Sequence, residues 1–173
     1  MRLDLLPVRD PETGHRLAVV ETPKGSRNKY DFDPALGAMR VKSVLPAGMA
    51  FPFDFGFLPQ TLAGDGDPLD VLILSDDAIA SGCVVAIRLL GAIEAEQRRG
   101  DGAWIRNDRL IAVLAASHDH ADLESIEQIG TTTLDEIEAF FTQYDRLKGV
   151  EFRVIGRSGP QRAAAIADRQ RRA

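Results

Sequence analysis

Two hydrophobic patterns divide the chain. In the first two thirds, apolar and β-branched residues alternate with polar ones in short runs between Gly, Pro and Asn. These runs predict strands at residues 15–21, 29–33, 38–44, 71–74, 83–94 and 110–114. Gly91 is expected to bend the longest of them. Strands at this spacing are typical of a small barrel.

The last third changes to helical spacing. Apolar residues recur on one helical face over 134–147, and the Thr and Glu of 133–136 have the pattern of a capping box. A last strand is expected over 151–156, before an Ala-rich helix that a second capping box at 158–161 would begin. Since no linker divides the sequence, residues 1–173 predict one α+β domain, a barrel with helices on its outside.

Composition narrows the class of protein. The 45% of hydrophobic and 27% of charged residues are ordinary for a globular protein, and the net charge of -5 argues against a general nucleic-acid binder. The single cysteine, Cys83, excludes an internal disulfide and fits a reducing compartment. The first residues lack the apolar run of a signal peptide, and no stretch could span a bilayer. We therefore expect a cytoplasmic protein without a membrane or nucleic-acid partner.

The most informative segment is an acidic turn, residues 64–70 (GDGDPLD), directly before an apolar strand. Asp65 and Asp67 are two residues apart and can face one cavity in an extended chain, while Asp70 enters the strand. Crowded carboxylates repel each other and are tolerated when a cation binds them, and hard oxygen ligands favour Mg²⁺, Mn²⁺ or Ca²⁺. The alternative is an ordinary surface turn, because Asp, Gly and Pro all form turns.

A second polar group lies upstream, over residues 21–31. It combines a carboxylate, several cations and a Gly-Ser turn, and phosphate groups bind donors of this kind. By itself this signal is weak, because a charged loop is usually only solvated.

Taken in order, these segments resemble the family I soluble inorganic pyrophosphatases. The matching segments are 21–30 (ETPKGSRNKY), 52–61 (PFDFGFLPQT), 65–71 (DGDPLDV), 110–113 and 140–144. The resemblance covers roughly residues 15–157 and implies an OB-like five-stranded β-barrel with flanking C-terminal helices. It also implies Mg²⁺-dependent hydrolysis of inorganic diphosphate to two phosphates in a homo-oligomer that is commonly a hexamer in bacteria. Mn²⁺ is the alternative to Mg²⁺ as the metal.

The resemblance carries roles onto individual residues. It places Asp67 as the base that helps to activate the attacking water. The positions that correspond to metal ligands are Asp65, Asp70, Asn107 and Glu21. The positions that correspond to substrate-binding residues are Lys29, Ser43, Phe55, Arg109 and Tyr144. These roles suit the reaction, because divalent ions lower the pKa of a bound water and shield a leaving phosphate.

Several of these positions depart from the family pattern. Ser43 stands for an Arg, Phe55 for a Tyr, Asn107 for an acid and Asp145 for a Lys. The neighbouring Lys42 is expected on the opposite side of its strand, so it does not simply replace the Arg. Loss of one preorganised donor costs about 3–4 kcal/mol of transition-state stabilisation, so several losses can slow diphosphate cleavage.

One further acid of the pattern, five residues before Asn107, has no secure counterpart, and Glu96, Asp101 or neither could fill it. The departures leave two alternatives open beside the diphosphatase. One is a phosphohydrolase with a different substrate, and the other is a non-catalytic homologue that binds metal or phosphate.

Overall fold

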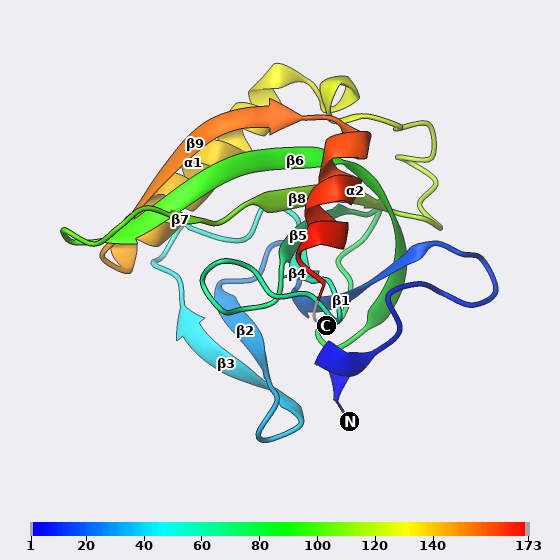
Figure 1. Ribbon diagram of the computed structural model, residues 1–173, viewed down its shortest axis with the longest axis horizontal. Coiled ribbons are helices and arrows are strands. Elements are labelled where there is room, and N and C mark those ends of the chain that lie inside the picture. Colours follow the sequence, from blue (N-terminus) through cyan, green and yellow to red (C-terminus); the bar gives the residue numbers. More distant parts are fainter. Residues whose placement is uncertain (1, 172–173) are drawn as a thin grey trace.

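The computed structural model describes residues 2–171, and Figure 1 shows their arrangement. Its strands are β1 (Arg16–Thr22), β2 (Asn28–Asp33), β3 (Ala38–Val44), β4 (Asp54–Phe57), β5 (Asp70–Leu74), β6 (Val84–Arg99), β7 (Ile105–Arg106), β8 (Arg109–Leu114) and β9 (Val150–Ser158). Its helices are η1 (Leu3–Leu5), η2 (Ile126–Ile129), α1 (Thr131–Leu147) and α2 (Pro160–Arg169).

Five strands close into a ring, which confirms the predicted barrel. β1 pairs with β4, β4 with β5, β5 with β8, β8 with β6, and β6 returns to β1. All of these pairs are antiparallel except β5 with β8. Ring closure leaves the barrel strands without a free edge and supports the loops at its rim rigidly.

Strand β5, which follows the acidic turn, is apolar at four consecutive residues because both of its faces are buried. Leu72 belongs to the core cluster that also contains Phe141 of α1, and Ile73 to the cluster that contains Ile166 of α2. Both β5 residues are fully buried. Since both faces of this strand contribute to core clusters, the strand needs apolar side chains on both sides.

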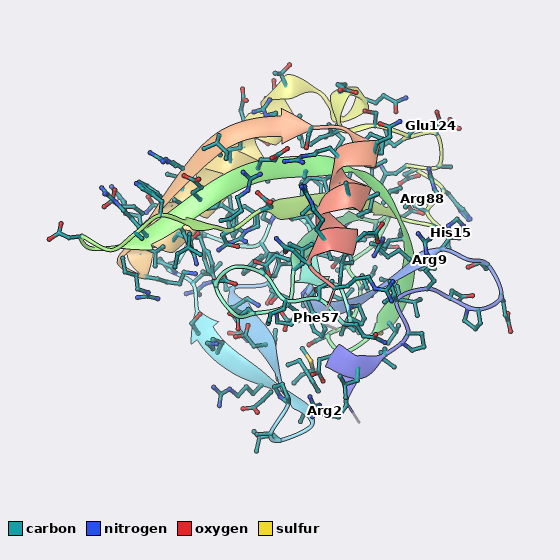
Figure 2. All side chains as sticks on the ribbon, in the orientation of Figure 1. Arg2, Arg9, His15, Phe57, Arg88 and Glu124 are labelled. Atoms are coloured by element: carbon teal, nitrogen blue, oxygen red, sulfur yellow. The ribbon has the colours of Figure 1, made fainter. Side chains whose placement is uncertain are left out.

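Gly91 bends β6 as predicted. The register with β8 shifts between Leu89 and Gly91, and a Cβ on Gly91 would lie 2.4 Å from the Ser158 carbonyl oxygen and 2.7 Å from Ile126 Cβ. Another β6 residue, Arg88 (Figure 2), fixes the loop before η2 by donating hydrogen bonds to loop carbonyls. The bend therefore lets β9 and η2 pack closely against the barrel.

Both helix starts were predicted wrongly. α1 begins after Gly130, so the expected box at 133–136 lies inside the helix, and α2 begins at Pro160 after Gly159 rather than at Ser158. Proline is preorganised for a first helical position, which explains the second shift. The capping box instead lies at 125–128, at the start of η2. None of the helices within residues 2–171 is long and apolar enough to cross a membrane.

The hairpin of β2 and β3 forms a separate two-stranded sheet beside the barrel. In Figure 1 it extends from the barrel on the side opposite α1 and β9. The acidic turn lies between this hairpin and the β6–β7 end. The hairpin and the β6–β7 end lie on two sides of the candidate site.

Candidate active site

A cleft of about 1060 Å³ opens between the β2–β3 hairpin, the acidic turn and the ends of β6, β8 and α1. Every site residue nominated from the sequence lines this cleft. They are Glu21, Lys29, Ser43, Phe55, Asp65, Asp67, Asp70, Asn107, Arg109 and Tyr144. The fold therefore gathers residues that are far apart in sequence around one space.

The acidic turn is held by its own backbone. The Ala63 amide donates to the Asp67 carbonyl oxygen at 2.7 Å, and the Gly66 amide donates to the Ala63 carbonyl oxygen at 3.0 Å. Gly66 has a φ of 92°, a left-handed conformation that disfavours other residues. The Asp67 amide also donates to Asp65 Oδ1 at 3.2 Å, which sets the relative positions of these two residues.

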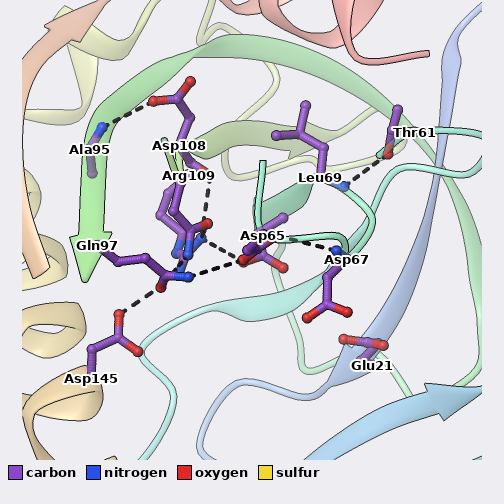
Figure 3. Close-up of polar contacts among 12 residues, drawn as sticks. Glu21, Thr61, Asp65, Asp67, Leu69, Ala95, Gln97, Asp108, Arg109 and Asp145 are labelled. Carbon is purple, nitrogen blue, oxygen red and sulfur yellow. Dashed lines mark hydrogen bonds and ion pairs between the residues drawn. The ribbon is translucent and has the colours of Figure 1, made fainter. Parts of the chain in front are cut away.

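Two carboxylates of the turn have raised pKa values. Burial raises the pKa of Asp70 to about 6, although Arg109 Nη1 lies 2.6 Å from Asp70 Oδ2. Desolvation and the neighbouring Asp65 also raise the pKa of Asp67. In Figure 3 the Asp67 carboxylate points away from the Asp65 contact and toward the side of the cleft where Glu21 lies. Such a site favours a bound cation.

Lys29 lies at the base of the hairpin side of the cleft. Its Nζ is 3.0 Å from Glu21 Oε2 and 2.6 Å from Asp31 Oδ1, and it lies 4.7 Å from the centre of the Phe55 ring. Burial opposes the charge of Lys29, but Glu21 and Asp31 outweigh it and hold the Lys29 pKa above its ordinary value. Burial raises the pKa of Glu21. The ammonium group therefore stays charged and fixed above an apolar ring.

A β-bulge corrects the expectation for Lys42. Consecutive β2 residues face Ser43 and then Val41 on β3, so Lys42 is the extra residue of a bulge and strict alternation fails there. Lys42 Nζ lies 2.6 Å from Asp31 Oδ2, and both Lys42 and Ser43 line the cleft. The lysine predicted to face away is therefore directed toward the site.

Arg109 is a buried cation in the opposite wall. It is only 3% exposed, and its guanidinium lies 4.9 Å from the centre of the Phe141 ring and 5.6 Å from that of Phe152. It donates a hydrogen bond to the Asn107 side-chain oxygen and pairs with Asp70. These contacts leave it little freedom to move.

The sequence analysis missed Gln97. Asn107 Nδ2 donates to Gln97 Oε1 at 2.6 Å, and Gln97 Nε2 donates to Asp65 Oδ2 at 3.3 Å. Glu96 pairs with Arg153 instead, and neither Glu96 nor Asp101 lines the cleft. Gln97 could have been found only from the hairpin register, which pairs it with the residue two positions before Asn107.

Tyr144 and Asp145 place the end of α1 at the cleft. The Tyr144 ring stacks on Phe140 at 5.8 Å between centroids, and burial raises the Tyr144 pKa to about 12. Asp145 is fully buried, 2.6 Å from Lys148 Nζ and 3.9 Å from Arg109 Nη2. The reversed charge at this position therefore lies between two cations of the site.

The acids suit a hard divalent cation by their chemistry. Within residues 2–171, no three acidic, His or Cys side chains come close enough to hold an ion as they stand, because most are turned to partners of their own. They nevertheless line one cleft, and burial raises the pKa values of Asp67 and Asp70. Carboxylate oxygens are the ligands that hard divalent cations prefer.

Known proteins with this sequence pattern agree on one family. The profile of the inorganic pyrophosphatase family matches residues 18–172. The inorganic pyrophosphatase of Thermus thermophilus is 40% identical over 159 residues, which cover 89% of this chain and 87% of that protein. The enzyme of that name from Nostoc sp. is 34% identical over 168 residues, 97% of this chain and 96% of that protein.

Solved structures give the same answer. The crystal structure of the Thermus thermophilus inorganic pyrophosphatase superposes with a TM-score of 0.87 at 34% identity, covering 98% of this chain and 97% of that one. The Helicobacter pylori enzyme gives a TM-score of 0.82 at 31% identity over 95% of each chain. With the family match spanning nearly the whole sequence, this chain belongs to the inorganic pyrophosphatase family.

Proposed function

We propose that this protein hydrolyses inorganic diphosphate to two phosphates with Mg²⁺ as its metal and Mn²⁺ as a substitute. The observation that carries the proposal is the shared cleft, in which the acidic turn faces Lys29 and Tyr144 in a member of the inorganic pyrophosphatase family. Family I pyrophosphatases are generally metal-dependent. The acid-rich turn matches a reaction that needs cations to neutralise a highly charged substrate.

We assign the acids as follows. Asp65 and Asp70 would hold divalent ions, and Glu21 would contact an ion that arrives with the substrate. Bound divalent ions supply charge neutralisation and a more acidic water. Asp67 accepts a proton as the water oxygen attacks one phosphorus, and the bond from that phosphorus to the bridging oxygen breaks. The raised pKa of Asp67 favours this role, because a base works best with a pKa near the working pH.

The phosphate groups would meet cations from the hairpin. Lys29 is fixed by its acidic neighbours, and the bulge brings Lys42 to the cleft beside Ser43, which offers only a hydroxyl. We infer that Lys42 supplies the positive charge that Ser43 lacks. Tyr144 offers a hydroxyl that stays protonated, whereas Phe55 contributes an apolar support for Lys29.

We further propose that the chain acts as one domain and assembles as a homo-oligomer, as a hexamer by family resemblance. In support, β3 and the turn before it leave Leu36, Val41 and Val44 exposed. Exposed large apolar side chains along one hairpin favour contact with another protein surface. Light scattering coupled to size exclusion would give the mass, and a monomer at micromolar concentration would contradict assembly.

The function is tested by phosphate release from purified protein. Diphosphate, a nucleoside triphosphate and an aryl phosphate ester are each assayed with Mg²⁺, with Mn²⁺ and with EDTA. We expect metal-dependent release that is fastest with diphosphate. Release only from the ester would favour a different phosphohydrolase, and no release with either metal would favour a non-catalytic protein.

A further inference from the structure

Gln97, Asn107 and Arg109 form one wall of the cleft, named here the amide wall. Hydrogen bonds run through it in one direction, from Arg109 to Asn107, from Asn107 to Gln97 at 2.6 Å, and from Gln97 to Asp65 at 3.3 Å. Each amide donates through its nitrogen and accepts through its oxygen. Bonds aligned in this way polarise one another, so the chain stabilises a single orientation of both amides.

This donor set does not suit a divalent cation. The two amide oxygens already accept hydrogen bonds, and neither side chain carries negative charge. An ion could bind the Asn107 oxygen only by displacing the hydrogen bond that Arg109 donates to it. A hard cation seeks carboxylates and leaves such a position for the acids on the turn.

Arg109 cannot easily leave to make room. Asp70 pairs with it at 2.6 Å, Asp145 lies 3.9 Å from it, and the rings of Phe141 and Phe152 pack against it. Because the side chain is 3% exposed, moving it would leave buried acids unpaired. The guanidinium is therefore a permanent positive charge of the site.

We propose that the amide wall takes the place of a divalent ion. Arg109 neutralises this side of the cleft, and the amides hold Asp65 in position without binding metal themselves. The metal-loaded protein then carries one ion fewer per chain than the same fold with acids at positions 97 and 107. This inference gives Asn107 a role other than metal ligand, and it rests on the proposed metal site at the acidic turn but not on the hydrolysis itself.

Manganese binding tests the inference without an activity readout. Free Mn²⁺ is counted by electron paramagnetic resonance during titration of the parent and of the double variant Gln97→Glu/Asn107→Asp, without substrate. The expected result is one additional ion per chain in the double variant. The control, Gln143→Glu/Gln161→Glu, adds the same charge on exposed helical positions outside the cleft and should bind as the parent does. Equal stoichiometry in the parent and the cleft variant would overturn the inference.

A second measurement uses the parent alone and covers the case in which the double variant does not fold. Crystals of the parent grown with Mn²⁺ should show no anomalous peak within coordination distance of the Asn107 side-chain oxygen. A peak there would overturn the inference. Phosphate release on the same samples separates the two proposals: turnover with a metal at Asn107 contradicts only the amide wall, whereas no turnover with the expected metal counts contradicts only the hydrolysis.

Discussion

Lys42 illustrates how a single residue can change sides of a strand. Alternation along β3 predicts that it faces away from Ser43, but the bulge removes one step of the pleat and brings both residues to the cleft. A bulge depends on the partner strand, so a pattern read along one strand does not reveal it. The bulge thus supports the proposal that Lys42 supplies the positive charge that Ser43 lacks.

The role of Lys42 can be measured in the kinetics. Lys42→Met removes the ammonium group and keeps much of the apolar stem, so KM for diphosphate should rise about tenfold, the equivalent of one charge-assisted contact. Arg169→Met removes a positive charge from an exposed position of α2 outside the cleft and should leave KM unchanged. Equal KM values for the parent and Lys42→Met would remove Lys42 from substrate binding.

Two glycines, Gly56 and Gly91, lie where neighbouring strands approach closely. A structural role was predicted from the sequence only for Gly91. Gly91 was expected to bend its strand, and the close approach of β9 and η2 explains why no side chain fits there. Gly56 on β4 has an even closer neighbour, since a Cβ on Gly56 would lie 1.9 Å from the Val19 carbonyl oxygen, yet β4 was not predicted. Four residues containing a glycine give too little alternation to identify a strand.

Substitution of Gly91 should weaken the packing of β6. Gly91→Ala places a methyl group against the Ser158 carbonyl and Ile126, so the free energy of unfolding should fall by about 1–3 kcal/mol, the usual cost of overpacking. Gly156→Ala is the matched control, because a Cβ there meets nothing within 4 Å. Urea unfolding measures both, and equal losses would contradict the close-packing explanation.

The contact between α2 and the barrel predicts a dependence on pH. Hydrogen bonds from Arg162 on α2, together with Arg106, hold the Glu94 pKa at about 2, below its ordinary 4.5. A carboxylate whose pKa is lowered by folding contributes stability above its unfolded pKa, and this contribution is lost as pH falls through the window from 4.5 to about 2. The stability of Glu94→Gln should therefore fall less steeply across that window.

Urea unfolding of both proteins at about pH 5 and about pH 3 checks this prediction. Asp168→Asn is the comparison. Asp168 also lies on α2 but pairs with Arg16 of β1, so this substitution keeps the Glu94 contacts intact. If the parent and Glu94→Gln lost the same free energy of unfolding between the two pH values, the Glu94 contacts would not contribute.

At the scale of the whole molecule, the local sequence pattern predicted the strands. It did not predict the helix starts or the contacts that depend on pairing between distant strands. The seven expected strands exist because their alternation is local. Five of them match within one residue at each end, while β6 runs on to Arg99 and β9 runs on to Ser158. The predicted capping boxes of α1 and α2 were wrong because Gly130 and Gly159, rather than the polar residues nearby, are the N-caps of these helices. Gln97 was not predicted as a site residue because only the register between β6 and β7 places it beside Asn107.

The site as a whole is an acidic cleft with cations on two of its walls. Lys29 and Lys42 lie on the hairpin side, and Arg109 lies on the other, with the acidic turn between them. That distribution suits a highly charged anionic substrate that arrives with metal ions. The acids can bind the ions, and the fixed cations can bind the negative charge of the substrate that the ions do not neutralise. The ten candidate residues could be nominated from sequence, whereas their pairings required the fold.

Phosphate release from diphosphate by the parent and by Asp67→Asn, with saturating Mg²⁺, tests the central claim most directly. Asp119→Asn, at an exposed loop position outside the cleft, serves as the matched control. The account predicts metal-dependent release by the parent and the control, and a loss of about 10²- to 10⁴-fold in Asp67→Asn, the usual contribution of a general base. Equal rates in all three proteins, or no metal-dependent release by the parent, would contradict it.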